Sequence, residues 1–347
     1  MRMLRLLKFG LFLTRWLPDP VCRALCYPFG ALTYLFRPRT RRTVQANQRQ
    51  VLGPVSTLRL QWQTWRVLVN AYHTYYSLLR ISVLSNEQLV ALIELRGREH
   101  LDAALARGRG VIILGTHMAN FNLLAPYIAL YRTPAGAIVE PLEPPGLFSF
   151  VSAVRSRTGL RLLSADRAGA GAAVSLLRAN GILAVAGDRY LGSNGMAVPF
   201  FGRPALLPHG EVILALRSGA PMVPASLLGL PKGRVLVEIH PPLPLVDTGR
   251  LRDDLATNMQ LIARALERMI GAAPDQWVML NPVWPADDTS AGIGGARDVA
   301  AGRRRPATDG ASHAGEPTAA EPPMGSRPRA TLATRRAAAP PTDATRA

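Results

Sequence analysis

The residues of this 347-residue chain best suited to do chemistry are His117 and Asn122, which have four residues between them. They follow Val111–Gly115, an apolar run that predicts a buried strand. His117 therefore stands at the carboxyl end of a strand, where open α/β sheets usually place their functional sites. The pattern after it predicts a helix over 118–131 that begins just after the histidine.

Such a histidine can take the proton from an alcohol that attacks a thioester carbonyl, because imidazole titrates near neutral pH. A neighbouring carboxylate would fix the ring tautomer and balance the imidazolium charge. Asn122 can accept a hydrogen bond from the ring but supplies no charge, so we expect the two side chains to face each other as a weakened dyad. Asn122→Asp would then raise activity, unless Glu140 or Asp188 already supplies the acid. The alternative is that His117 only terminates a strand and bonds locally.

Charged residues also end two other expected strands. Glu140 follows one of them, and Asp188 with Arg189 follows another. In a parallel sheet, these carboxyl ends share one edge with His117. Asp188 and Arg189 form either a structural ion pair or part of a site at that edge.

A further motif joins Phe200 and Phe201 to Gly202 and Arg203. Glycine permits close backbone approach, and arginine binds phosphate through two hydrogen bonds. Arg203 therefore suits a phosphate that lies beside a lipid chain. The alternative is a strand end that carries a solvated arginine.

The order of these motifs resembles the bacterial lauroyl/myristoyl and phosphatidylinositol mannoside acyltransferases. His117 and Asn122 fit the His-(four residues)-Asp/Glu motif of that superfamily, except that the acid position holds Asn122. The similarity covers roughly residues 4–285. The other segments that carry it are 72–80, 100–110, 187–190, 198–205, 207–210, 219–224, 274–277 and 282–285.

The resemblance implies a glycerolipid acyltransferase-like fold and an O-acyltransferase. The enzyme would move a fatty acyl group from acyl-CoA or acyl-ACP to a hydroxyl of a glycolipid or phospholipid, with His117 as the base. It implies no metal and no bound cofactor, since the acyl thioester is a co-substrate. In the mannoside acyltransferases a Glu and an Arg at the spacing of Glu140 and Arg155 line the acceptor pocket, although these two could instead be a surface pair. The candidate substrate-binding residues are Glu140, Arg155, Asp188, Arg189 and Arg203.

Two departures from the family pattern leave a second function open. Asn122 replaces the motif acid, and residues 195–199, where many relatives carry another acid, have none. The chain could therefore be a catalytically weakened or inactive lipid-binding or scaffold protein on the same fold.

The elements that must position these residues alternate from about residue 92 onward. This alternation predicts an α/β fold with a largely parallel central sheet flanked by helices. The expected strands are 93–96, 111–115, 135–139, 160–163, 182–186, 222–227 and 234–240. The expected helices are 101–106, 118–131, 145–158, 168–179, 210–218 and 251–270, after a largely helical first third that includes 56–82.

The charge of the chain, +18 in total, lies mostly at its amino end. Residues 1–80 hold twelve arginines and Lys8 against the single acid Asp19. Bulky apolar residues alternate with these cations, as in helices that lie on anionic membranes, whereas a nucleic-acid reader would present a more polar face. No segment reaches the roughly 20 clean apolar residues of a spanning helix. We expect peripheral attachment to the cytoplasmic face of the inner membrane, with a single embedded helix as the alternative.

The remaining composition divides the chain into three parts. We expect a basic helical membrane-associating region at 1–82, an α/β domain at 83–288, and a disordered Ala/Pro/Thr/Arg-rich tail at 289–347. Cys22 and Cys26, one helical turn apart, are expected to be ordinary apolar residues rather than a disulfide or metal pair, which fits a reducing compartment.

Overall fold

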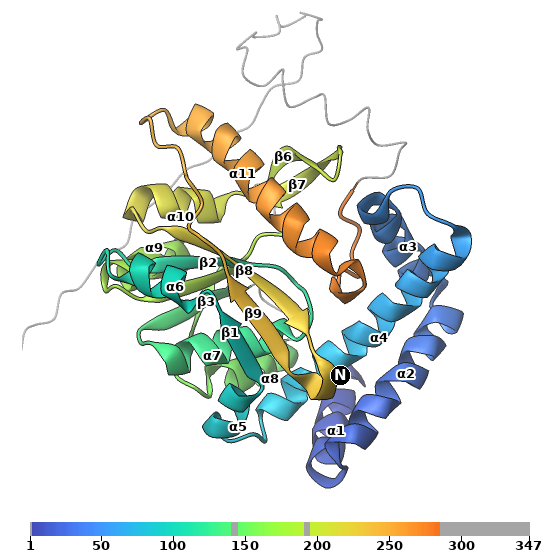
Figure 1. The fold of residues 1–347 in the computed structure, drawn as a ribbon. Helices are drawn as coiled ribbons and strands as arrows, with labels where there is room; N and C mark the ends of the chain where they lie inside the picture. The colour runs from blue at the N-terminus through green and yellow to red at the C-terminus, as the bar shows by residue number, and fades with distance from the viewer. Residues whose placement is uncertain (1, 140–144, 191–194, 285–347) are drawn as a thin grey trace, which may run out of the picture. The chain divides into compact units, whose positions relative to one another are not determined.

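Residues 2–81 of the chain are almost entirely helical (Figure 1). The computed structural model describes residues 2–139, 145–190 and 195–284, and these belong to one compact unit, Met1–Ile293. The first helices are α1 (Arg2–Trp16), α2 (Asp19–Phe36), α3 (Pro38–Leu52) and α4 (Thr57–Ile81). The predicted tail lies outside the described residues.

Helix α2 is tied to α4 by one carboxylate. Asp19, in the first turn of α2, forms ion pairs with Arg23 and Arg80. It also accepts a hydrogen bond of 2.6 Å from the hydroxyl of Tyr76 on α4. The only acid in the basic amino-terminal segment therefore acts as the anchor between two of its helices.

Strands and helices alternate after α4, as the sequence predicts. The strands are β1 (Ile93–Arg96), β2 (Val111–Gly115), β3 (Ala135–Val139), β4 (Arg161–Ser164), β5 (Ile182–Ala186), β6 (Gly195–Phe200), β7 (Arg203–Pro208), β8 (Met222–Gly229) and β9 (Val235–Ile239). The helices are α5 (Asn86–Ala91), α6 (Arg98–Leu105), α7 (Leu124–Tyr131), α8 (Pro145–Ser156), α9 (Arg167–Arg178), α10 (Gly210–Ser218) and α11 (Leu251–Ala272). Short 3₁₀ helices are η1 (Phe121–Leu123), η2 (Pro231–Gly233) and η3 (Pro274–Gln276).

In the described part of the chain, the central sheet has seven strands in the order β1-β9-β8-β2-β5-β3-β4. The pairs β8-β2, β2-β5, β5-β3 and β3-β4 are parallel. Strand β9 is antiparallel to β8, and β1 is parallel to β9. The predicted α/β fold with a largely parallel sheet is therefore confirmed.

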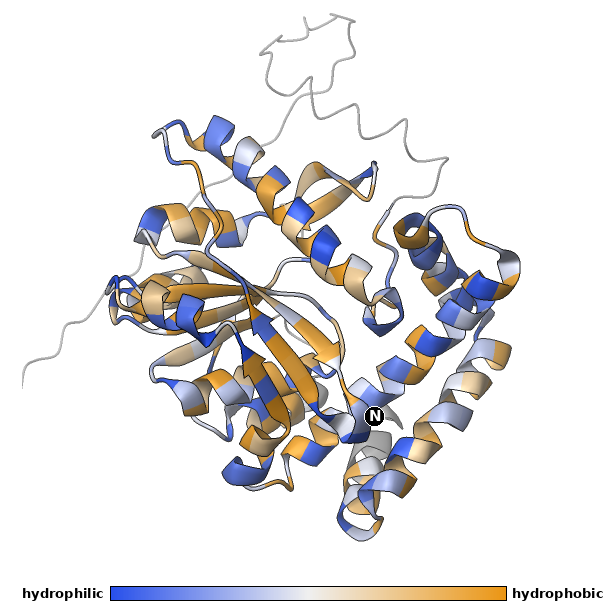
Figure 2. Cartoon of the chain, viewed as in Figure 1, coloured by the Kyte–Doolittle hydropathy of each residue, from blue (hydrophilic) through white to orange (hydrophobic). Residues whose placement is uncertain are grey.

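The two faces of the sheet are covered by different helices. Residues of α9, α10 and α11 pack with Ile112 and Leu114 of β2 on one face, and α5 to α8 with the end of α4 pack with Val111 and Ile113 on the other. All five residues of β2 are buried, which explains their uninterrupted apolar sequence. The hydropathy of the residues follows this arrangement. The strands are mainly apolar, and polar and apolar residues alternate along α11 (Figure 2).

Two local differences from the expected elements matter for the site. The helix predicted to begin at Met118 begins only at Leu124, after a turn and the 3₁₀ helix η1. Strands β6 and β7 form a separate antiparallel hairpin that we did not predict. Its turn holds Phe201 and Gly202 at φ of 49° and 79°, the left-handed conformation typical of two-residue hairpin turns.

Candidate active site

His117 meets a carboxylate at the carboxyl edge of the sheet. It follows β2, and Asp188 follows the neighbouring β5, whose register pairs Gly115 with Ala186. The ring nitrogen Nδ1 of His117 lies 2.8 Å from Oδ1 of Asp188. The backbone N–H of His117 donates to Oδ2 of the same carboxylate at 2.9 Å. One acid therefore binds both the ring and the backbone of the histidine.

The carboxylate of Asp188 is fully buried, which is costly for a charge unless hydrogen-bond donors surround it. A third donor is the indole N–H of Trp277, 2.8 Å from Oδ2. Burial alone raises the pKa of Asp188. The positive charge of His117 and the hydrogen bonds from His117 and Trp277 outweigh burial and hold that pKa below its usual range. The group is thus an anion in a dry, fully bonded position.

Trp277 reaches the site because the closing segment, which is residues 274–284 after α11, pairs with the backbone next to His117. Met118 and Trp277 form an isolated antiparallel bridge. The N–H of Val278 donates to the carbonyl oxygen of His117 at 2.9 Å. Backbone pairing therefore fixes the indole in position beside Asp188.

The other ring nitrogen of His117, Nε2, is the one placed to accept a proton. With its proton on Nδ1 toward Asp188, the neutral ring presents a lone pair at Nε2. No described residue hydrogen-bonds Nε2, and the His117 side chain keeps 17% of its surface exposed. The ring of Phe121 contacts the imidazole edge-on, at a centroid distance of 5.0 Å. This arrangement is that of a general base oriented by an acid.

Asn122 does not have the place expected for it. Its Oδ1 accepts a hydrogen bond of 2.9 Å from Nη2 of Arg155, and its Nδ2 donates to the carbonyl oxygen of Thr74 at 3.2 Å. The expected pairing of His117 with Asn122 is therefore wrong, because the ring takes Asp188 instead.

The physical reason is the conformation of the residues between His117 and Asn122. Met118 is held in the bridge to the closing segment, and Ala119 has a φ of 48°. The hydroxyl of Thr74 donates to the carbonyl oxygen of Ala119 at 2.9 Å. The backbone thus makes a turn fixed to α4 before η1 begins, and Asn122 bonds to α4 and α8 rather than to the imidazole.

Arg155, which bonds to Asn122, is influenced by the charge of a second arginine, Arg189. Burial, and then the charge of Arg189, lowers the pKa of Arg155 to about 10, so that Arg155 is still a cation at neutral pH. Burial raises the pKa of Tyr75, on α4, while the charge of Arg189 opposes the rise. Arg189 therefore lies close to both side chains. Two guanidinium groups, a neutral amide and a phenol are a set that can bind an anion such as a phosphate.

Of the two remaining predicted site residues, the structure describes only Arg203, and it does not bring Arg203 to this edge. Glu140 lies outside the described residues. Arg203 lies at the turn of the β6-β7 hairpin, where Phe200 stacks on Trp284 at 5.7 Å. The ring centroid of Trp284 in turn lies 6.3 Å from that of Trp277, which bonds to Asp188. A row of aromatic rings therefore lies between the hairpin turn and the dyad. A hollow of about 500 Å³ at that turn is lined by Phe201, Gly202, Arg264, Glu267 and Arg268.

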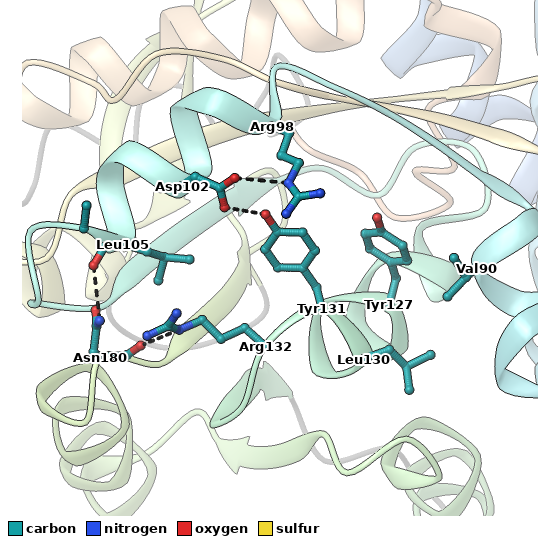
Figure 3. A pocket seen from close by; sticks show the side chains of 10 residues that line it. Val90, Arg98, Asp102, Leu105, Tyr127, Leu130, Tyr131, Arg132 and Asn180 are labelled. Carbon is teal, nitrogen blue, oxygen red and sulfur yellow. Dashed lines mark hydrogen bonds and ion pairs between the residues drawn. The ribbon is translucent and has the colours of Figure 1, made fainter.

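A larger hollow, of about 670 Å³, contains none of these residues (Figure 3). Its polar side includes Asp102, which binds both Arg98 and the hydroxyl of Tyr131. Ala106, Arg132 and Asn180, also in its lining, precede β2, β3 and β5 in the sequence. The hollow therefore lies at the amino edge of the parallel strands, opposite His117.

The sequence prediction gave two residues of the site lesser roles than the structure does. It assigned Asp188 to substrate binding and named it, with Glu140, only as a possible second acid for His117, and it placed Trp277 only in a segment, 274–277, that resembles the family. The expected strands 111–115 and 182–186 already carried a usable signal, because side-by-side pairing places the residues after them together. For Trp277 the sequence carries no such signal, since its contact depends on a single bridge.

The chain is similar in sequence to a known family and to proteins of known activity. The model of the family described as bacterial lipid A biosynthesis acyltransferase matches residues 3–285. The chain is 26% identical over 225 residues to a phosphatidylinositol mannoside acyltransferase of Mycobacterium tuberculosis, covering 63% of this chain and 69% of that one. It is 25% identical over 289 residues to the lipid A biosynthesis lauroyltransferase of Escherichia coli, covering 78% of this chain and 87% of that one. A Mycolicibacterium smegmatis phosphatidylinositol mannoside acyltransferase is 25% identical over 226 residues, which are 64% and 72% of the two chains.

Proposed function

The chain belongs to the bacterial lipid A biosynthesis acyltransferase family and is an O-acyltransferase, and from this we propose its reaction in detail. It moves a fatty acyl group from an acyl-CoA or acyl-ACP thioester to a hydroxyl of a glycolipid or phospholipid. Acceptors of the lipid A or phosphatidylinositol mannoside type are favoured by the names of its relatives. The observation that supports this most is the bonding of His117 to the buried, ionised Asp188.

In the proposed reaction, Nε2 of His117 takes the proton of the acceptor hydroxyl while its oxygen attacks the thioester carbonyl carbon. A C–O bond forms, the C–S bond breaks, and the imidazolium returns the proton to the departing thiolate. Asp188 keeps the Nδ1–H tautomer and balances the imidazolium charge without taking the proton. Trp277 holds the carboxylate so that the ring cannot turn away.

Arg155 and Arg189 are proposed to bind a phosphate of the substrates. Both thioester carriers contain phosphate, and so do phospholipid and lipid A acceptors. Because Asn122 is neutral, it orients Arg155 by one hydrogen bond and leaves its charge uncompensated toward an incoming anion. Arg203 and Glu140 stay as proposed contacts to substrate parts farther from the reacting atoms.

The catalytically inactive alternative loses its main support at this site. That alternative depended on the missing motif acid at Asn122, and Asp188 supplies a carboxylate to the same imidazole. The base therefore has an acid partner, and the enzyme is the function that the residues support best.

We also propose that α1 and α2 attach the enzyme to an anionic membrane surface. In the described part of the chain no helix is long and apolar enough to cross a bilayer. The α1 stripe, made of Phe9, Phe12 and Trp16 at helical spacing, has all three side chains more than half exposed. On α2, the exposed apolar residues are Val21, Leu25, Tyr27, Phe29, Leu32, Leu35 and Phe36.

Exposed apolar stripes of this size on a soluble monomer need a covering partner. The basic residues of the same segment favour an anionic lipid surface, into which apolar side chains can insert. Attachment to the cytoplasmic face of the inner membrane would bring the enzyme to its lipid acceptor.

The proposed reaction is tested by transfer of a radiolabelled acyl group from acyl-CoA and from acyl-ACP into total membrane lipid. We expect the intact protein to label a lipid. Mild alkali should release the labelled acyl group from that lipid, because it is held by an ester bond. His117→Ala should abolish the label. His240→Ala is the matched control, because His240 bonds to Ser226 rather than to the dyad. Equal labelling by the His117 variant would refute the proposed base.

A further inference from the structure

Helix α3 buries two amide side chains, although most of its residues are polar. Asn47 and Gln48 are 2% and 1% exposed, and Val44 is the third buried residue of this helix. Positions 44, 47 and 48 lie on one face of a helix, so this face packs against the rest of the fold. Burying an amide is costly unless hydrogen bonds replace those it made with water. The two amides therefore need partners inside the protein.

The partners of Asn47 are backbone groups of the closing segment. Its Nδ2 donates to the carbonyl oxygens of Met279 at 3.2 Å and Asn281 at 2.8 Å. Its Oδ1 accepts from the N–H of Val283 at 3.3 Å. Apart from η3 and the isolated bridge, the closing segment, as the structure describes it, forms no helix or strand, so its backbone groups depend on outside partners. One side chain of α3 thus satisfies several of them.

Gln48 bonds to the closing segment on the other side of Trp277. Its Nε2 donates to the carbonyl oxygen of Pro274 at 2.8 Å. The same oxygen accepts the backbone N–H of Trp277 at 3.2 Å. After Trp277, the N–H of Met279 donates to the carbonyl oxygen of Trp277 at 2.9 Å. The two neighbouring amides of α3 therefore hold the chain both before and after Trp277.

We propose that Asn47 and Gln48 are positioning residues that act on the dyad through Trp277. The indole N–H of Trp277 lies 2.8 Å from Oδ2 of Asp188, and a hydrogen bond weakens steeply when its donor moves or tilts. By holding the backbone on both sides of Trp277, the two amides keep the indole on the carboxylate that orients His117. This inference rests on the proposed acyl transfer and adds two residues from outside the dyad to it.

The two amides differ in what their replacement leaves behind. Oε1 of Gln48 is buried with no hydrogen-bond partner among the described residues. Gln48→Met removes that atom and leaves the carbonyl oxygen of Pro274 with the N–H of Trp277, so the thermal midpoint should change by less than about 3 °C. Asn47→Leu instead takes a buried hydrogen bond from Met279 and should lower the midpoint by about 5 °C or more.

The test compares variants of the full chain by kcat, KM and thermal midpoint. Asn47→Leu should lower kcat about tenfold and Gln48→Met about threefold, both at unchanged KM, because each lets the indole move from Asp188. Asn258→Leu is the matched control. Asn258 is a fully buried residue of α11 whose amide bonds to the N–H and the carbonyl oxygen of Val246 at 2.8 and 2.7 Å. The control should lose thermal stability as Asn47→Leu does, while its kcat stays within about twofold of the native value.

A double variant separates an action through Trp277 from a general loosening of the fold. Trp277→Phe already lacks the indole donor, so adding Asn47→Leu to it should lower kcat by less than about threefold further. Losses that multiply in full would overturn the proposal. So would full activity of either single variant, or an equal loss of kcat in Asn258→Leu.

Solvent exchange of the Trp277 indole N–H, followed by NMR with isotope-labelled tryptophan, tests the same contact without the reaction. Its signal is the one that is absent in Trp277→Phe. The N–H should exchange slowly in the native chain and in Asn258→Leu, and about tenfold faster in Asn47→Leu. If the native protein transfers no acyl group, the proposed function fails, and this exchange alone decides the positioning role. Equal exchange in the native chain and in Asn47→Leu would overturn it.

Discussion

Replacing Asp188 by asparagine removes the charge of the dyad and also reverses one of its hydrogen bonds. Oδ2 of Asp188 accepts from the N–H of His117 and from the indole of Trp277, whereas Oδ1, among the residues that the structure describes, accepts only from Nδ1 of His117. An asparagine would keep its carbonyl oxygen at the position with two donors. Its NH₂ group would then face Nδ1, and Nδ1 would have to become an acceptor.

That change moves the remaining ring proton to Nε2. This is the atom that must take the proton of the lipid hydroxyl in the proposed reaction. The histidine would then be in the wrong tautomer to act as the base. In the serine-protease triad, the equivalent substitution costs about 10⁴ in kcat for this reason. Because the partly exposed ring can turn once the carboxylate that holds it is replaced, we expect a loss in kcat on the order of 10³ to 10⁴, or about 4 to 5.5 kcal/mol of transition-state stabilisation.

The assay is the initial rate of acyl transfer at saturating thioester, together with the thermal midpoint to show that the variant is folded. Asp275→Asn is the matched control, because Asp275 lies in the same closing segment but pairs with Arg66 at 3.0 Å. The control should keep most of the activity, since Asp275 does not contact the dyad and its ion pair with Arg66 is partly exposed, a kind of pair that contributes about 1 kcal/mol to stability. A loss under tenfold in Asp188→Asn, with the fold intact, would refute the role given to this carboxylate.

Three further predictions follow, two from the contacts of the site and one from the exposed α1 stripe. Asn122→Asp should place its charge on Arg155 rather than on His117, so kcat should change by less than about threefold while KM rises because Arg155 binds a substrate phosphate less well, and a hundredfold gain in kcat would restore the direct pairing of residues 117 and 122. Trp277→Phe keeps the packing but removes one donor to Asp188, so kcat should fall about tenfold and the pKa of Asp188 should rise, measurable as acid destabilisation that begins at higher pH. Replacing the α1 stripe by serine should weaken binding to anionic vesicles at every salt concentration, while added salt should weaken binding of the native chain, and unchanged vesicle binding would contradict the proposed attachment.

Much of the fold could be predicted because its signals are local. The strands 111–115, 135–139 and 182–186 and the helix 210–218 have the predicted bounds, since uninterrupted apolar runs and a glycine after the helix mark them. The hairpin β6-β7 was missed because its strands contain Pro199, Pro204 and Pro208, which argue against a strand.

The dyad partner was predicted less well, for a reason of distance along the chain. Spacing within a motif suggested Asn122, five positions after His117. Asp188, by contrast, lies 71 positions away and becomes a neighbour only through the pairing of β2 with β5. A sequence pattern reports nearby residues well, whereas the register between strands decides which distant residues meet.

The closing segment has a consequence for how the enzyme is made. Two of the three donors to Asp188 come from His117, but the third comes from Trp277, 89 positions later. During synthesis the carboxylate therefore cannot lose its hydration at low cost until the ribosome has released that tryptophan. Contacts of such long sequence separation form late in folding. A nascent or truncated chain would carry the base without its completed acid partner, so acyl transfer should begin only when the whole fold has closed.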